Sequence, residues 1–343
     1  MPNMEVTNEG SMALYNRLLK DPPRGPTVPF KPLRANAYTE NGKALVAIVR
    51  SDDRSRGINE ATSLLGGLGP IVEGVRGEFL IKPNCNTDDP YPRDTHPETF
   101  RAIANGLLSA GVPAGKIVLG ETSGRARGLP TRHTLENLGM LEVVEDLGLG
   151  VCFFEEDEWV TVKPPEAAAW PEGIKISRRV YEAERVILTP IMRPHSNTAF
   201  TISLKLAVGM LDSMGREWLH NGHAFHDKMM DLNLAYSADL VVADATKILV
   251  DKELTPGKAA APGIIIASGS RVASDAVSVA LMRLYGVDRI MERSVWDHEQ
   301  FKVAKSRGLR PSGLEGIALR TSNLADDPGF EDTVSGIVSE LEG

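Results

Sequence analysis

Residues 78–86 read EFLIKPNCN, a short apolar run that ends abruptly in a polar turn. Continuous apolar runs of this length are typical of strands in a parallel sheet, because helices cover both faces of such a strand. We therefore predict a buried strand over Glu78–Lys82. The polar residues that follow it then stand at the carboxyl end of the strand, where parallel α/β folds place their ligand sites.

Comparable runs occur before and after this strand and alternate with segments of helical pattern. Further strands are predicted at Ala44–Val49, Lys116–Gly120, Val151–Phe154, Arg185–Ile191, Asp239–Asp244, Gly263–Ser268 and Gly316–Leu319. Helices are predicted at Asn59–Leu68, Pro97–Ala110, within Thr131–Leu147, at Ser274–Tyr285 and at His298–Arg307. This alternation predicts an α/β fold: a mostly parallel, doubly wound sheet with right-handed crossovers and helices on both faces.

The chain is predicted to contain an arm and two α/β parts. Residues 1–43 are rich in Pro, Asn and Gly and form the N-terminal arm, with a short helix around Ala13–Leu19. This arm is expected to pack on the body of the protein or on a second subunit. The first α/β part covers residues 44–155. The second covers 156–343 and begins with a loop or β-excursion over Glu156–Ser177, and the two parts could also form one continuous domain.

Composition and charge exclude several classes of protein. A net charge of −8 argues against a nucleic-acid or anionic-membrane partner, which would need clustered Lys and Arg. The two cysteines, Cys85 and Cys152, are too few for a four-cysteine zinc site or a self-contained iron–sulfur cluster. No dinucleotide fingerprint follows a strand, so no NAD is expected. The sequence shows neither an export signal nor a long apolar window, so we expect a cytoplasmic protein, and a homo-oligomer is left open.

The densest set of potential ligand side chains lies between residues 193 and 231. This span holds four of the seven histidines of the chain: His195, His220, His223 and His226. Neutral imidazoles could bind a divalent metal ion of unspecified identity. Residues six apart drift off a shared helical face, so all three later histidines can converge only if the stretch is partly loop, as Gly222 favours. The alternative is a set of ordinary exposed histidines.

Lys205 lies in the same span, within an otherwise apolar run that predicts an amphipathic helix beginning near Thr198. Desolvation on an apolar face lowers the pKa of a lysine and would make Lys205 a nucleophile, a base or an anion clamp. The alternative is a side chain that extends its ammonium to the surface.

Polar residues also follow the other predicted strands. Lys82, Asn84 and Asn86 could hold a carboxylate or phosphate through charge-assisted hydrogen bonds, or could form a polar turn. His96 precedes a helix, as a cap or as a substrate contact, and Cys85 is either a small buried filler or a thiolate near Lys82.

Residues 120–125, GETSGR, form a turn whose backbone N–H groups with Arg125 would suit an oxyanion. Glu121 in this turn and Arg193 after another strand are further predicted contacts. The carboxyl ends of parallel strands share one edge of the sheet. Four segments that follow strands are therefore expected to share one cleft: Lys82–Asn86, Glu121–Arg125, His195 and Asp244.

Several sequence blocks resemble the prokaryotic family known as domain of unknown function 362. They are Ile81-Lys82-Pro83-Asn84, Thr95-His96-Pro97-Glu98, Gly120-Glu121, Arg193-Pro194-His195-Ser196, Ser203-Leu204-Lys205, His226 with Asp231-Leu232-Asn233, and Ala267-Ser268 leading to Ser274-Asp275-Ala276. The resemblance runs from about Lys43 to Leu319. Many members of that family carry a ferredoxin-like module, but this chain has no Cys-x-x-Cys run, so the resemblance implies no iron–sulfur cluster here.

The spacing of three residues also resembles the nickel-pincer lactate racemase family. That family has two α/β domains, a histidine followed ten residues later by the cofactor-bearing lysine, and a nickel-ligand histidine about sixteen residues further on. Here His195 and Lys205 are ten apart, and His220 lies fifteen beyond. The Gly-Gly run before the lysine is replaced by Ile202-Ser203-Leu204, so the resemblance implies the cleft geometry rather than the same cofactor.

Together these patterns predict an enzyme that acts on a small anionic organic molecule by metal- or His/Lys-assisted acid–base chemistry of lyase or isomerase type. Predicted catalytic residues are His195, Lys205 and Lys82. Predicted substrate contacts are Asn84, Asn86, His96, Glu121, Arg125 and Arg193. The alternatives are a hydrolase, a non-catalytic protein that binds or delivers a metal or cofactor, and a solute-binding or scaffold domain.

Overall fold

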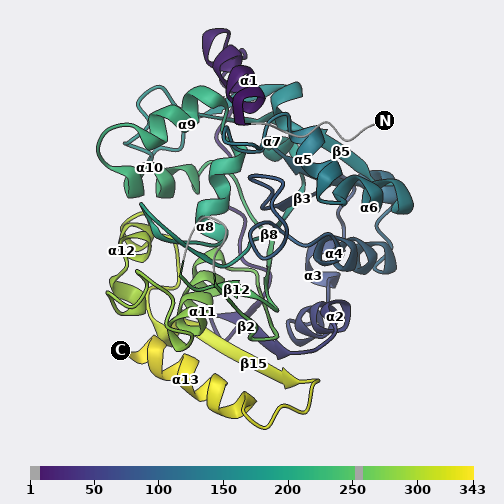
Figure 1. Ribbon diagram of the computed structural model, residues 1–343, viewed down its shortest axis with the longest axis vertical. Helices are drawn as coiled ribbons and strands as arrows, with labels where there is room; N and C mark the ends of the chain where they lie inside the picture. Colours follow the sequence, from purple (N-terminus) through teal and green to yellow (C-terminus); the bar gives the residue numbers. More distant parts are fainter. Residues whose placement is uncertain (1–7, 252–257) are drawn as a thin grey trace.

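The computed structural model describes residues 8–251 and 258–343. Within them the chain builds a nine-stranded central sheet (Figure 1). In spatial order its strands are β1 (Thr39–Glu40), β2 (Lys43–Arg50), β14 (Ile264–Ser268), β11 (Leu240–Ala245), β8 (Arg185–Thr189), β3 (Phe79–Pro83), β4 (Ile117–Glu121) and β5 (Gly150–Phe153), with β15 (Ile317–Asn323) also paired to β2.

Most neighbouring strands run in the same direction. Strands β11, β8, β3, β4 and β5 are parallel to one another, and β15 is parallel to β2. Strand β14 is antiparallel to both of its neighbours, β11 and β2. Every residue of β3, β11 and β14 is buried, which explains why these strands appear in the sequence as continuous apolar runs. The prediction of a mostly parallel, two-sided α/β sheet is confirmed.

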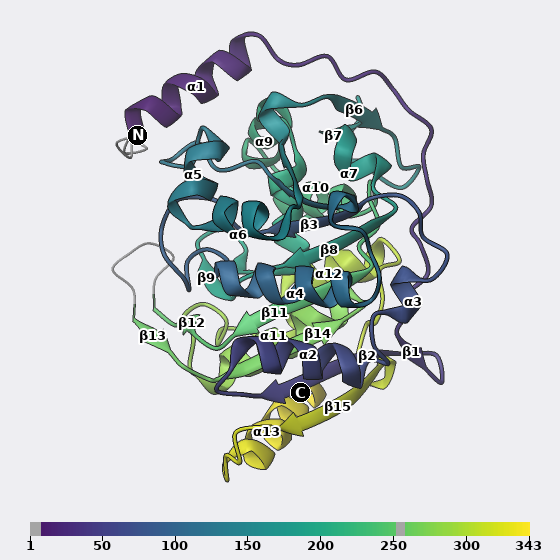
Figure 2. The same ribbon diagram turned by 90° about the vertical axis from the view of Figure 1, so that its right-hand side faces the viewer.

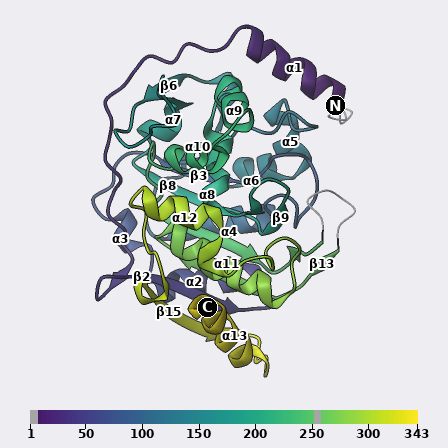
Figure 3. The same ribbon diagram turned by 90° about the vertical axis from the view of Figure 1, so that its left-hand side faces the viewer.

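Two hydrophobic cores lie on opposite faces of this sheet. Alternate residues of β2 divide between them: Val46 and Ile48 belong to one core, and Ala47 and Val49 to the other. Figure 2 shows the face covered by α2 (Arg54–Leu64), α4 (Pro97–Ser109) and α6 (Met140–Leu147). Figure 3 shows the face covered by α11 (Arg271–Leu284), α12 (Glu299–Ser306) and α13 (Phe330–Glu342).

Strands from both predicted α/β parts interleave in the one sheet. Strand β2 lies beside β14 and β15, and β3 lies beside β8. From β3 the chain proceeds to β4 and β5 in one direction, whereas β8 and β11 lie in the other direction. The carboxyl ends of β3 and β8 therefore flank the topological switch point, where open parallel sheets form a ligand crevice.

Residues 156–177 form the predicted β-excursion, a hairpin of β6 (Trp159–Val162) and β7 (Ile174–Ser177) followed by α7 (Arg178–Glu182). The region Thr131–Leu147 contains two helices, α5 (Thr131–Asn137) and α6, because Gly139 between them has a φ of 75°. Helix α3 (Gly69–Val72) is a single turn before β3.

The prediction that the helix carrying Lys205 begins near Thr198 is wrong. Ala199–Thr201 is strand β10, which pairs with β9 (Arg193–His195). Helix α8 (Ser203–Leu206) begins only where the Asp275 carboxylate accepts hydrogen bonds from the backbone N–H groups of Ser203 and Leu204, at 3.0 and 2.9 Å. A side chain from α11, distant in the sequence, thus fixes the start of the helix that carries Lys205.

The N-terminal arm packs on the body of its own chain. Helix α1 (Asn8–Lys20) lies against α9 (Ser213–His220), and the arm then runs along the edge of the molecule to β1 (Figure 2). The Ser11 hydroxyl donates to the Arg125 carbonyl at 2.7 Å and accepts from the Leu129 N–H at 3.0 Å. Among the described residues, no helix is both long and apolar enough to cross a bilayer.

Candidate functional site

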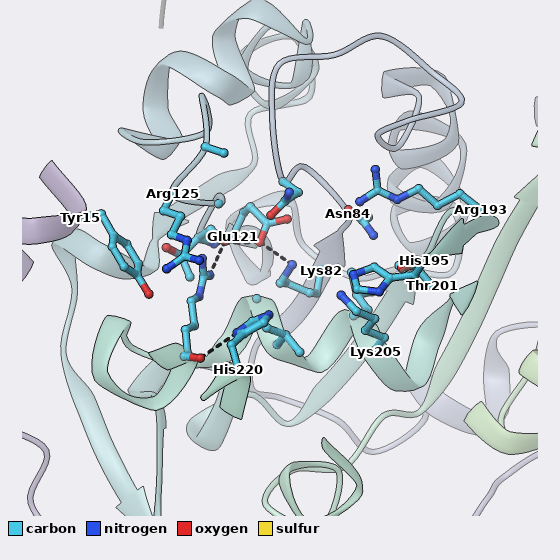
Figure 4. Close-up of a pocket in the computed structure, with 18 of the residues that line it drawn as sticks. Tyr15, Lys82, Asn84, Glu121, Arg125, Arg193, His195, Thr201, Lys205 and His220 are labelled. Carbon is cyan, nitrogen blue, oxygen red and sulfur yellow. Dashed lines mark hydrogen bonds and ion pairs between the residues drawn. The ribbon is translucent and has the colours of Figure 1, made fainter. Parts of the chain in front are cut away.

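A cavity of about 240 Å³ lies at the switch point of the sheet (Figure 4). Segments that follow β3, β4 and β8 supply its walls, together with the region from β10 to α9. Nine of the predicted site residues line it: Lys82, Asn84, Asn86, Glu121, Arg125, Arg193, His195, Lys205 and His220. The expected convergence in one cleft is therefore present for these nine, whereas Asp244 does not line the cavity and pairs with Arg54 at 2.6 Å.

The floor of the cavity is an ion pair between Lys82 and Glu121, whose side chains are 1% and 2% exposed. The Lys82 ammonium also donates to the Pro83 carbonyl at 2.7 Å. The Glu121 carboxylate accepts backbone hydrogen bonds from Cys85 at 2.9 Å and Thr122 at 2.8 Å. Burial lowers the pKa of Lys82, and the Glu121 charge opposes this shift. Glu121 thus fixes Lys82 in place. Burial raises the pKa of Cys85, so Cys85 is a small buried thiol.

Gly209 lies directly against this ion pair. A Cβ atom at this position would stand 2.8 Å from Lys82 Nζ and 3.1 Å from Glu121 Oε1. Gly209 belongs to the short 3₁₀ turn Ala207–Met210 that follows α8. The absence of a side chain lets the backbone cover the pair and hold the lysine against the cavity.

Positive charge predominates among the described residues that line the cavity. Five lining side chains are cationic and two are carboxylates: Lys82, Arg125, Arg193, Lys205 and Arg216 against Glu121 and Glu217. Both carboxylates are already engaged, Glu121 by Lys82 and Glu217 by Arg125 at 2.7 Å. The cavity lining therefore favours an anionic ligand.

Arg193, His195 and Lys205 form one side of the cavity. Arg193 is 5% exposed, His195 is 7% exposed and Lys205 is half-buried. Burial lowers the pKa of His195, and the positive charges of Lys205 and Arg193 lower it further. Burial raises the pKa of Asp94 to about 7, and the positive charge of Arg193 opposes this upward shift. Figure 4 shows this group on one side of Lys82, with Tyr15 and Arg125 on the other.

The two histidines of the cavity hold opposite tautomers. His195 Nδ1 accepts a hydrogen bond from the Asn197 N–H at 3.1 Å, so the neutral ring carries its proton on Nε2. His220 Nδ1 lies 2.7 Å from the Arg216 carbonyl, which can only accept, so Nδ1 carries the proton and Nε2 keeps its lone pair. Burial lowers the pKa of His195, and partial desolvation lowers that of the surface-exposed His220, so both rings are neutral at pH 7.

Three other predicted histidines lie outside this cavity. His96 caps α4, where its Nδ1 accepts from the Glu98 N–H at 3.1 Å, and it lines a separate cavity of about 690 Å³ with Arg54 and Lys247. His226, on α10 (Phe225–Leu232), lines a third cavity, and His223 is exposed in the preceding loop.

The predicted four-histidine metal set is therefore not assembled. Helix α9 ends at His220, and Ala224 takes a left-handed φ of 63° before α10 begins, so the chain turns between the histidines. In residues 8–251 and 258–343 no group of three or more His, Cys, Asp or Glu side chains could hold a metal ion. His195 also directs Nδ1 at an N–H and keeps its proton on Nε2, a state that suits hydrogen bonding rather than metal ligation.

Among the lining residues that were not predicted from the sequence are four with polar or charged side chains: Tyr15, Thr201, Arg216 and Glu217. Arg216 is buried and donates to the carbonyls of Thr122 and Ser123 at 2.7 and 2.5 Å, which fixes the turn after β4. Arg216 and Glu217 precede His220 by four and three residues on α9, so helical spacing could have found them. No local pattern indicated Tyr15, which reaches the cavity from the arm.

The fold and the cavity define an α/β protein with a cationic site at a switch point. The chain belongs to the family described as Domain of unknown function (DUF362), whose sequence profile matches residues 79–280. This confirms the resemblance seen in the sequence. The matched region contains every residue that lines the cavity except Tyr15.

The chain is also similar to individual proteins, including one from Synechocystis and one from Thermoanaerobacterium thermosaccharolyticum. A thylakoid-associated protein from Synechocystis is 25% identical over 243 residues, which cover 66% of this chain and 72% of that protein. The lactate racemase apoprotein from Thermoanaerobacterium thermosaccharolyticum aligns with a TM-score of 0.38 and 15% identity, over 65% of this chain and 56% of that one. The alignment thus spans little more than half of the racemase chain.

Proposed function

We propose that this protein is an enzyme that binds a small organic anion in the 240 Å³ cavity and converts it by acid–base chemistry of isomerase or lyase type. The observation that carries the proposal is the convergence of Arg193, Lys205 and two neutral histidines in one cavity at the switch point. This combination supplies charge for binding and proton-transfer groups for chemistry.

The charges support the binding half of the proposal. Arg193 and Lys205 lie close enough to His195 to lower its pKa, and like charges brought together are stabilised by an anion placed between them. Charge-assisted hydrogen bonds from Arg and Lys suit a carboxylate. The cavity is smaller than the roughly 300–1,000 Å³ typical of drug-sized ligands, which favours a small metabolite.

The histidines support the chemical half. A neutral imidazole can accept a proton at its lone pair or donate a hydrogen bond from its N–H. A positioned histidine that transfers a proton contributes typically about 10²–10⁴-fold. His195 and His220 contribute rings that are neutral and held by backbone hydrogen bonds at 3.1 and 2.7 Å. Lys82, fixed by Glu121, is available as a further electrostatic contact.

The test is a calorimetric titration with acids and their uncharged amides. Propionate, pyruvate and succinate are compared with propionamide in wild type, in Lys205→Gln, and in Lys305→Gln, whose lysine is exposed on α12. We expect at least one acid to bind, the amide to bind far more weakly, and Lys205→Gln to lose about tenfold in affinity, or about 1.4 kcal/mol. Equal binding of acid and amide, or an unchanged Kd in Lys205→Gln, would refute the proposal.

A further inference from the structure

We infer that the site enolises a small carboxylic acid that carries a carbonyl group, such as a 2-oxo acid, with His220 as the base and His195 as the hydrogen-bond donor to the carbonyl oxygen. The inference rests on the proposed function and names its substrate class and the role of each imidazole. The carrying observation is that both rings line the same cavity with Nδ1 bound to the backbone, which leaves Nε2 as a lone pair in His220 and as an N–H in His195.

His220 is placed and oriented as a base. Its Nδ1–H is held by the carbonyl of Arg216, one turn earlier on α9, at 2.7 Å. Its ring packs edge-on against Phe225, with 5.5 Å between the ring centroids and 71° between the planes. His220 is exposed at the mouth of the cavity, so solvent can replace a proton that Nε2 has taken up. Leu206 and Val208 supply apolar lining in the same cavity, as a C–H substrate requires.

His195 is placed as the opposite partner. Its Nδ1 is occupied by the Asn197 N–H, which leaves the proton on Nε2. The ring is buried and lies near the positive charges of Lys205 and Arg193. A fixed N–H donor and two cations stabilise negative charge that develops on an oxygen atom. This side of the cavity therefore suits an enolate oxygen and the carboxylate next to it.

The proton transfer balances without a cofactor. His220 Nε2 takes the proton from the carbon beside the carbonyl, and the C–H electron pair forms the carbon–carbon double bond. The carbonyl electrons move onto the oxygen, where His195 Nε2–H donates a hydrogen bond. Return of a proton from His220 to the same carbon regenerates the substrate, and in heavy water the returning particle is a deuteron.

Deuterium exchange followed by proton NMR tests the inference. Pyruvate and 2-oxobutyrate are incubated in D₂O with wild type, His220→Gln, His195→Gln and the control His133→Gln, whose residue lies on α5 outside the cavity. Propionate and butyrate, which lack the carbonyl, serve as matched substrates. We expect catalysed exchange of the 2-oxo acids alone, a loss on the order of 10²–10⁴-fold in His220→Gln, a smaller loss in His195→Gln, and full activity in His133→Gln.

Two results would overturn the inference. One is exchange no faster than in buffer for both 2-oxo acids, and the other is full exchange in His220→Gln. If the titration still shows acid-specific binding, only the enolisation is refuted and the anion site stands. If the acids do not bind at all, the proposed function itself is refuted.

Discussion

Lys82 and Glu121 form a buried ion pair at the carboxyl ends of the adjacent strands β3 and β4, and the backbone of Gly209 lies against it. The pair joins two walls of the cavity and sets the position of one of its cations. Desolvation of both charges is costly, so the pair adds little net stability and mainly fixes the positions of the two side chains. Each partner, however, is needed as long as the other is present.

Removal of the carboxylate alone should be strongly destabilising. Glu121→Gln leaves the Lys82 ammonium buried without its counter-charge, which costs about 3–5 kcal/mol. The double variant Lys82→Met with Glu121→Gln removes both charges and should recover part of this loss. Urea unfolding of wild type, the single variant and the double variant measures the effect. A single variant within about 0.5 kcal/mol of wild type would contradict the buried-pair interpretation.

Gly209→Ala should disturb ligand binding through Lys82. The added Cβ would lie 2.8 Å from Lys82 Nζ, so the lysine must move. We expect a stability loss of about 1–3 kcal/mol and weaker binding of the anion. Gly115→Ala is the matched control, because nothing lies within 4 Å of its Cβ position. Titration and thermal unfolding report the two effects, and identical anion affinity in Gly209→Ala and Gly115→Ala would rule out contact between this turn and the binding site.

The sequence predicted the parts of the site that follow buried strands. Lys82, Glu121 and Arg193 come directly after or at the ends of apolar runs, and the common edge of a parallel sheet then brings them together. His195 and Lys205 also follow this logic, although the helix expected around Lys205 starts later than predicted. Its start depends on Asp275, and no local pattern reveals a cap supplied by a distant helix.

Other parts of the site could not be predicted because they depend on how the chain turns. His220, His223 and His226 form a regular spacing, but α9 ends at His220 and the left-handed Ala224 precedes the helix that carries His226. His96 lies in a sequence block that indicated a site residue, yet it caps α4 and lines a different cavity. Tyr15 joins the site from the N-terminal arm, and only the tertiary packing of α1 brings it there.

The contact between Tyr15 and Glu217 should be measurable as a coupling energy. The Tyr15 hydroxyl donates to Glu217 Oε1 at 2.9 Å, and Glu217 also pairs with Arg125. Tyr15→Phe should cost about 1.5–3 kcal/mol, because the acceptor is charged. A double-mutant cycle with Glu217→Gln should give a coupling of about 0.5–3 kcal/mol. Strict additivity of the two substitutions would show that α1 does not dock on α9 in solution.

His298 should make the stability of the protein depend on pH. Its ring packs edge-on against Phe200 of β10, and burial lowers its pKa from 6.5 to about 4. Between these values the unfolded chain binds the proton and the folded chain does not, so the contribution of His298 to stability falls as the pH drops, by about 1.4 kcal/mol per pH unit. His298→Gln should remove this contribution and so change the slope of the profile between pH 6.5 and 4 relative to wild type. Urea midpoints at a series of pH values test this, and parallel profiles for variant and wild type would contradict it.

A crystal structure of the protein with the tightest-binding small acid tests the central claim most directly. We predict density for the acid in the cavity at the switch point, with its carboxylate within hydrogen-bond distance of Arg193 or Lys205. An acid bound instead in the larger cavity beside His96, or an empty switch-point cavity at saturating ligand, would contradict the claim.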